Sequence, residues 1–173
     1  MTTSGELLMQ WLRDAHATEK QAIESVENQV DRLKNYLELR NWAQEHVDTA
    51  GRHRELIREC IERRGGSTST VKDVTMNLVG KFQAFTGVVA ADEVLKNVIA
   101  DYSFKHYQIA CFKSLIAAAE EAADQDTKQA CEGMLVADQK LADRLLPYTS
   151  QVTNEYAARG GRCGSQTLRI ILQ

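Results

Sequence analysis

The stretch over residues 91–123 constrains this chain more than any other, because its apolar residues recur at steps of three and four positions. That spacing predicts one long helix with a continuous apolar stripe. The stripe consists of Val94, Leu95, Val98, Tyr102, Ile109, Phe112 and Ile116. In its middle, where a core helix would carry two more aliphatic residues, the chain reads Lys-His-Tyr-Gln over residues 105–108. Burying an unpaired polar group costs on the order of 1–3 kcal/mol, so other helices must supply partners for this cluster.

Three more long helices are expected in the rest of the chain, which has 173 residues, 43% of them hydrophobic, and a single proline, Pro147. The first is expected to begin near Ser4, an acceptable N-cap residue. The second follows a turn at residues 34–36 and ends at the glycine pair 65–66. The fourth begins after a turn at residues 124–126, and Pro147 is expected to kink it.

The segment over residues 71–85 is apolar enough to pack but too short for a full bundle helix. We expect a short crossover helix there, between the second and third long helices. Such a crossover lets those two helices run in the same direction, as ferritin-like bundles with one long connection require. The sequence therefore predicts an all-α fold, a ferritin-like four-helix bundle over residues 1–158.

A glycine-hinged tail over residues 159–173 is expected to follow the bundle. Its last part, residues 166–173, is rich in residues that favour strands. A lone extended segment leaves its backbone groups unpaired, so we expect it to lie across a neighbouring subunit or to pair with its symmetry mate, in a homodimer. The alternative is that it packs against its own bundle.

Composition argues against several other classes of protein. The formal net charge is only −3, and basic residues alternate with acidic ones, which is typical of solvated helix faces and not of a nucleic-acid-binding patch. No stretch approaches the roughly 20 apolar residues of a membrane span. The four cysteines form no Cys-x-x-Cys pair and are expected as reduced thiols, so we predict a cytoplasmic protein.

Each of the four expected long helices places a metal-competent side chain on its inward face. Carboxylates and imidazoles converge on di-metal sites in bundle cores, which makes this pattern a candidate metal site. The usual Glu-x-x-His pairs are incomplete, because Ala50 stands three residues before His53 and Leu141 three residues after Asp138. The alternative is a buried hydrogen-bonded network that fixes helix register without a metal. The candidate ligands are Glu19, His53, His106 and Asp138, with His16, His46 and Asp48 as weaker candidates.

Several stretches of the chain resemble motifs that occur together in one known family. Residues 14–22, Asp-Ala-His-Ala-Thr-Glu-Lys-Gln-Ala, resemble its first-helix motif Asp-Ala-Tyr-x-Ala-Glu-Lys-Gln-Ala. Residues 105–112 are similar to its Glu-His-Tyr-Glu-Ile-Ala-Ala-Tyr, and residues 138–143 to its Glu-Glu-Lys-x-Ala-Asp. Residues 46–49, together with His53, resemble its His-Leu-Glu-Glu segment and a later His or Gln. Taken together, these motifs resemble those of the YciE/YciF family of ferritin-like stress proteins, and the resemblance covers about residues 6–157.

The resemblance implies a four-helix bundle with a short crossover helix, a homodimer, a link to stress response and a di-metal site. Three family glutamates appear here as Thr49, Lys105 and Gln108, and the ammonium of Lys105 would repel a cation beside it. We therefore expect a partly degraded iron site, at which a single iron, zinc or manganese ion is held by the four main candidate ligands. The alternative function is a non-catalytic, dimeric interaction protein whose metal site is vestigial.

Overall fold

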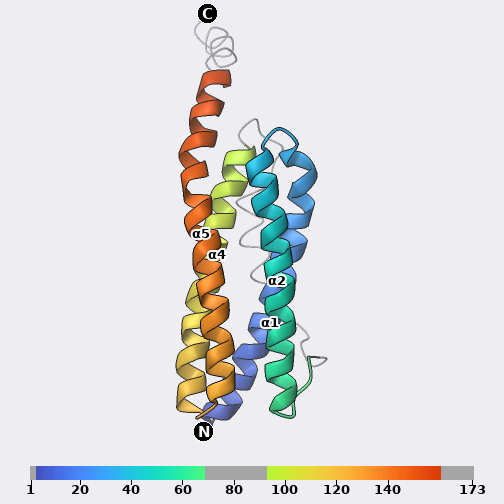
Figure 1. The fold of residues 1–173 in the computed structure, drawn as a ribbon, viewed down its shortest axis with the longest axis vertical. Helices are drawn as coiled ribbons and strands as arrows, with labels where there is room; N and C mark the ends of the chain where they lie inside the picture. The colour runs from blue at the N-terminus through green and yellow to red at the C-terminus, as the bar shows by residue number, and fades with distance from the viewer. Residues whose placement is uncertain (1–2, 69–92, 161–173) are drawn as a thin grey trace, which may run out of the picture.

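Four long α-helices make up almost all of the computed structural model, which describes residues 3–68 and 93–160 (Figure 1). A short 3-10 turn, η1 (Asp31–Leu33), follows the first helix. These helices confirm the predicted all-α four-helix bundle. The predicted crossover helix at residues 71–85 and the extended tail segment at residues 166–173 lie outside the described residues. The helices are α1 (Ser4–Val30), α2 (Leu37–Arg63), α4 (Glu93–Glu121) and α5 (Gln125–Gly160).

The helix ends follow local sequence signals. After α2, Gly65 adopts a φ of 73°, and the amides of Gly65 and Gly66 donate to the carbonyls of Glu62 and Ile61, which closes the helix as a Schellman motif. A Cβ at Gly66 would lie 2.8 Å from the thioether end of Met9, so that flexible side chain would have to shift to admit a larger residue. These contacts confirm the end predicted for the second helix.

The α4–α5 turn is closed by Asp124. The backbone amide of Thr127 donates to Asp124 Oδ1 at 3.0 Å, which makes Asp124 the N-cap of α5. Its other carboxylate oxygen lies 2.6 Å from the guanidinium of Arg64, so the end of α2 is tied to the start of α5. α5 continues through Pro147 to Gly160.

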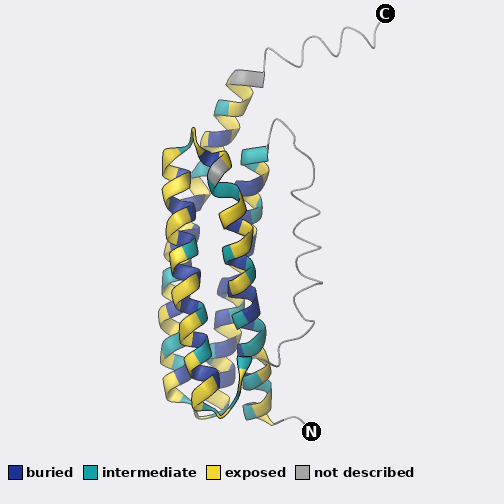
Figure 2. Cartoon of the chain, turned by 90° about the vertical axis from the view of Figure 1, so that its right-hand side faces the viewer, coloured by how far each residue is buried: buried dark blue, intermediate teal, exposed yellow. Residues whose placement is uncertain are grey.

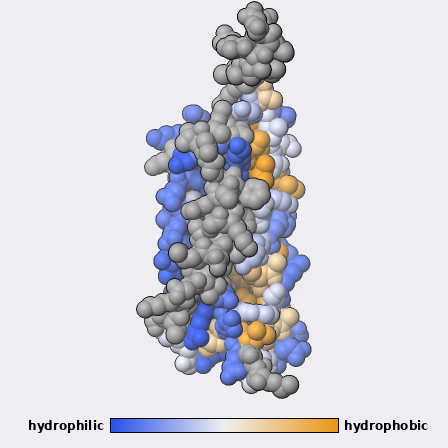
Figure 3. All heavy atoms as spheres, turned by 180° about the vertical axis from the view of Figure 1, so that it is seen from behind, coloured by the Kyte–Doolittle hydropathy of each residue, from blue (hydrophilic) through white to orange (hydrophobic). Residues whose placement is uncertain are grey.

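The helices run antiparallel within each hairpin, α1 with α2 and α4 with α5, while α2 and α4 run in the same direction (Figure 1). This arrangement is the one that the predicted crossover requires. Buried residues line the inward faces of all four helices and exposed residues the outward faces (Figure 2). Seen from behind, the described surface is largely hydrophilic, with apolar patches toward one side (Figure 3). None of the described helices combines the length and the apolar character that a membrane span needs.

The core consists of two main apolar clusters, one toward each end of the bundle. The first contains Leu12 of α1 and Phe112 of α4, and the second contains Val26 of α1 and Val98 of α4. The residues of α1 and α4 that lie between these positions in the sequence include buried charged and polar side chains. The fold therefore places a polar layer near the middle of the bundle.

Candidate metal centre

The polar layer brings together side chains from all four helices. Glu19 comes from α1, His53 from α2, Lys105 and Gln108 from α4, and Asp138 from α5, and none of them is more than 4% exposed. Each sits at a position where helical periodicity continues the apolar stripe of its own helix. Water is therefore excluded from the layer, so its polar groups have to satisfy one another or a bound ion.

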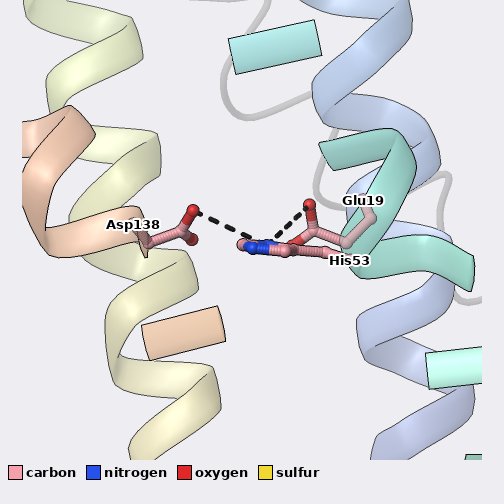
Figure 4. A group of neighbouring side chains, drawn as sticks. All are labelled: Glu19, His53 and Asp138. Carbon is pink, nitrogen blue, oxygen red and sulfur yellow. Dashed lines mark ion pairs between the residues drawn. The ribbon is translucent and has the colours of Figure 1, made fainter. Parts of the chain in front are cut away.

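Glu19, His53 and Asp138 form a cluster in which one donor atom from each lies within 4.8 Å of the others (Figure 4). The Nδ1 atom of His53 is 3.7 Å from Asp138 Oδ1 and 3.9 Å from Glu19 Oε2, too far for hydrogen bonds. Within the described part of the chain, His53 Nδ1, Glu19 Oε2 and Asp138 Oδ2 have no hydrogen-bond partner. Buried polar atoms are rarely left unpaired, and a cation at this point would satisfy all three side chains.

The helix α4 engages one oxygen of each carboxylate. The ammonium of Lys105 donates to Asp138 Oδ1 at 2.9 Å, and the amide of Gln108 donates to Glu19 Oε1 at 2.8 Å. Both members of the Lys105–Asp138 pair are 0% exposed. Lys105 thus faces a core carboxylate, and the two contacts form a partial buried hydrogen-bonded network between α4 and the helices α1 and α5.

Burial sets the protonation states of the three candidate ligands. It lowers the pKa of His53 to about 3, with the charges of Lys105 and Arg52 acting in the same direction, so the imidazole is neutral at pH 7. It raises the pKa of Glu19 to about 8, although the charge of Lys105 opposes the shift. Burial also raises the pKa of Asp138, and Lys105 again opposes this. At neutral pH the layer therefore holds a neutral imidazole at His53 and a protonated carboxyl group at Glu19.

The structure corrects the prediction for His106, which does not reach this cluster. Its side chain is exposed, and its ring packs edge-on against Tyr102 with the ring centroids 4.4 Å apart. Successive helical residues are rotated by about 100°, so with Lys105 and Gln108 facing the core, position 106 points away from it. Sequence reasoning placed the polar cluster on α4 correctly and misassigned which of its members faces inward.

The three weaker candidates also lie outside the cluster. His16 is half-buried, and its Nε2 atom accepts a hydrogen bond of 3.2 Å from Arg54. Asp48 is exposed and accepts a hydrogen bond from a glutamine one turn earlier. His46 is fully buried and packs edge-on against Trp42, but its two ring nitrogens have no hydrogen-bond partner within the described residues. Burial keeps the pKa of His46 well below its ordinary value, so this imidazole is neutral.

Gln108 holds Glu19 in place, whereas the sequence had pointed to it only as part of the polar cluster and as the counterpart of a family glutamate. The signal was available as spacing, because buried polar residues of α4 recur at Asn97, Asp101, Lys105 and Gln108, at steps of four, four and three. Such a polar stripe along the inward face of a helix indicates contact with polar side chains of neighbouring helices. Burial raises the pKa of Asp101 to about 7, although a hydrogen bond from Gln29 opposes the shift.

A four-helix bundle with parallel second and third long helices and a buried carboxylate–imidazole cluster at its middle defines a ferritin-like protein. Within that class, the chain belongs to the family described as "Domain of unknown function (DUF892)", whose model matches residues 3–158.

Solved structures support the same fold. A protein from Xanthomonas campestris pv. campestris is 29% identical, with a TM-score of 0.77 over 91% of this chain and 98% of its own. The E. coli stress protein YciF is 16% identical, with a TM-score of 0.74 over 89% of this chain and 99% of its own. A Desulfovibrio desulfuricans bacterioferritin, described with a diiron site, is 20% identical, with a TM-score of 0.72 over 92% of this chain and 87% of its own. The last two likenesses concern the fold alone.

Proposed function

We propose that this protein binds a single divalent cation through Glu19, His53 and Asp138. The observation that supports this is the convergence of three buried side chains from three helices, each of which has one atom without a hydrogen-bond partner among the described residues. One imidazole and two carboxylates suit Fe²⁺, Mn²⁺ and Zn²⁺. Iron is the first metal to test, because the bacterioferritin neighbour is described with a diiron site.

The charge of Lys105 is the reason for proposing one ion and not two. Its ammonium lies 2.9 Å from Asp138 Oδ1 and would repel a second cation at that carboxylate. The positions three residues before His53 and three residues after Asp138 are occupied by Ala50 and Leu141, which are buried and offer no donor atom. The donor set that remains is sufficient for one ion.

The candidate ligands differ in whether they must lose a proton before they can bind a metal ion. His53 is already neutral and can bind a cation without releasing a proton, whereas Glu19 must release its proton before its carboxylate can bind one. Gln108 holds Glu19 Oε1, which leaves Oε2 on the side of His53. Metal binding is therefore coupled to proton release and strengthens as the pH rises toward 8.

A bound iron or manganese ion would supply redox chemistry, which links the site to iron handling or to oxidative stress. We infer the stress connection from the motifs shared with the YciE/YciF family and from the fold shared with the E. coli stress protein. The protein would then act in the cytoplasm, where its described cysteines, Cys60, Cys111 and Cys131, are free thiols. We also infer a homodimer to which residues 160–173 contribute.

A second candidate function is favoured by the Lys105–Asp138 ion pair. The ammonium supplies the positive charge that a metal would bring, and with Glu19 protonated the layer is electrically neutral without a metal. In this interpretation the metal site is vestigial, and the protein acts as a non-catalytic, dimeric interaction protein.

Metal content separates the two candidates. The full chain is purified without a histidine tag from medium supplemented with iron, manganese and zinc, and bound metals are counted by mass spectrometry. We expect about one ion per chain in the wild type and loss of that ion in His53→Gln. His46→Gln is the matched control, because His46 is a buried imidazole on the same helix outside the cluster.

Two results would contradict metal binding. One is a wild-type protein that is metal-free after purification and takes up no Fe²⁺ in anaerobic titration, which would favour the vestigial site. The other is equal metal content in His53→Gln and His46→Gln, which would place any bound ion elsewhere.

A further inference from the structure

A cavity of about 290 Å³ lies between α1 and α4, outside the ligand cluster. Its size is close to the lower end of small-molecule pockets, which span roughly 300–1,000 Å³. Two exposed small residues of α4, Ala110 and Ser114, leave room at this seam, and the buried Ala15 and Leu115 contribute apolar surface to its wall. The cavity therefore has the dimensions of a site for a small organic molecule.

Two aromatic residues line the cavity, Trp11 from α1 and Tyr107 from α4. Each residue is 36% exposed, and the ring of Tyr107 also stacks on Phe104 with the ring centroids 6.1 Å apart. Trp and Tyr present electron-rich faces that attract organic cations, and quaternary ammonium groups are often held between such rings. The aromatic content of the cavity thus favours a cation over an anion.

The charge of the cavity also favours a cationic ligand. Asp14 lies one helical turn after Trp11, and its partly buried carboxylate has no hydrogen bond or ion pair among the described residues. No lysine, arginine or histidine lines the cavity within the described part of the chain. Burial raises the pKa of Asp14. The pKa values of Tyr107 and Cys111 of α4 are raised mainly by burial, and the charge of Asp14 contributes to both shifts. An unpaired carboxylate beside aromatic rings is complementary to a positively charged ligand.

We propose that this cavity binds a small alkylammonium or trimethylammonium compound, with its charge at Asp14 and its methyl groups against Trp11 and Tyr107. The proposal does not rest on metal binding, because none of the three metal ligands lines the cavity. Phosphates and carboxylates are disfavoured as ligands, since the cavity offers them a carboxylate and no basic partner.

Choline and its uncharged isostere 3,3-dimethylbutan-1-ol test the proposal, because they differ in charge and hardly in shape. Affinities are measured by calorimetry on the full chain, and the binding position is read from the indole N–H signals of ¹⁵N-tryptophan-labelled protein. The sequence has two tryptophans, and Trp42 is 2% exposed in the apolar cluster with Val26. We expect choline to bind at least about tenfold more tightly than the isostere and to shift the Trp11 signal but not that of Trp42.

Variants show whether charge and space at this cavity are responsible. Asp14→Asn should weaken choline binding about tenfold or more and change the binding of the isostere by less than about twofold. Asp48→Asn, which removes an exposed carboxylate of α2, is the control and should leave the binding of both compounds unchanged. Ser114→Phe should fill the cavity and abolish binding, whereas Ala117→Phe, at an exposed position of α4 outside the cavity, should not. Circular dichroism verifies that each variant is folded.

A trimethyl-lysine peptide, tested beside choline, distinguishes the two sources of the ammonium group. Binding of choline supports a free metabolite as the ligand, and binding of the peptide alone supports a modified protein side chain. The proposal is overturned if neither ammonium compound binds. This result is expected if another part of the chain fills the cavity in solution. It is also overturned if the isostere binds as tightly as choline, or if Asp14→Asn and Ser114→Phe leave choline affinity unchanged.

Discussion

Replacing Lys105 with methionine removes the ammonium group from the core and keeps most of the apolar stem. In the wild type the ammonium lies 2.9 Å from Asp138 Oδ1, and both side chains are 0% exposed. Removing one partner of such a pair leaves the other charge buried and uncompensated, which typically costs about 3–5 kcal/mol. In a chain of this size each kcal/mol lowers the melting temperature by about 2–4 °C, so Lys105→Met should lower it by about 6–20 °C.

The loss should depend on pH, because Asp138 can escape its unpaired charge by taking up a proton. Burial already raises the pKa of Asp138, and removing the opposing charge of Lys105 raises it further. The variant should therefore be less destabilised at pH 5 than at pH 8. This trend distinguishes a lost ion pair from a packing defect, whose cost would not follow the titration of a carboxyl group.

A double-mutant cycle in urea, monitored by circular dichroism in the presence of a chelator, measures the pairing directly. Lys105→Met combined with Asp138→Leu should recover most of the loss, because an apolar pair of similar volume often replaces a buried ion pair without cost. Lys140→Met, at an exposed lysine of α5, is the control. The pairing would be refuted if Lys105→Met unfolded at the same urea concentration as the control. It would also be refuted if the double variant lost as much free energy of unfolding as the two single variants together.

Three further predictions concern the same layer and the tail. The pKa of Glu19 is raised from 4.5 to about 8, so its protonated form favours the folded state below pH 4.5 and this contribution is lost as the pH rises to 8. Glu19→Gln should flatten the fall of the free energy of unfolding over that window; an unchanged pH profile would argue against a protonated Glu19. Lys105→Glu with Gln108→Glu adds two carboxylates and should raise bound Fe²⁺ from about one ion per chain toward two, as titration would show; unchanged stoichiometry would mean that other positions limit the site. Deleting residues 160–173 should shift the protein toward monomer in sedimentation, and an unchanged dimer would exclude a role for the tail in assembly.

The helices were predictable because their signals are local. The turn at residues 34–36, Gly65 and Asp124 mark helix ends through backbone conformation and capping, which depend on a few neighbouring residues. At the start of α1 the capping residue is Thr3, one residue before the predicted Ser4: the amide of Glu6 donates to Thr3 Oγ1 at 3.2 Å, and the amide of Thr3 donates to Glu6 Oε2 at 2.8 Å. Glu19 and Asp138 were also predictable as core residues, because each stands alone among aliphatic neighbours at helical spacing. Neither inference needs knowledge of how the helices pack.

The inward face of α4 was harder to assign, because its polar residues lie on that face. Asn97, Asp101, Lys105 and Gln108 are all buried, whereas Tyr102, which the apolar pattern placed in the stripe, is only half-buried. Hydrophobic periodicity locates a core face only when apolar residues mark it. The rotation of α4 was therefore decided by contacts with Glu19 and Asp138, which a single helix does not encode.

That rotation determines what the middle of the bundle can bind. A histidine facing inward at position 106 would have added a neutral donor beside Asp138 and left the carboxylate open to a metal. The lysine that faces inward at position 105 instead occupies one oxygen of Asp138 with a fixed positive charge. A lysine is costly to bury, so it is tolerated here only because the carboxylate of α5 meets it. The same contact thus places a positive charge at the carboxylate oxygen that lies 3.7 Å from His53 Nδ1, which is why we propose that Glu19, His53 and Asp138 hold one ion and not two.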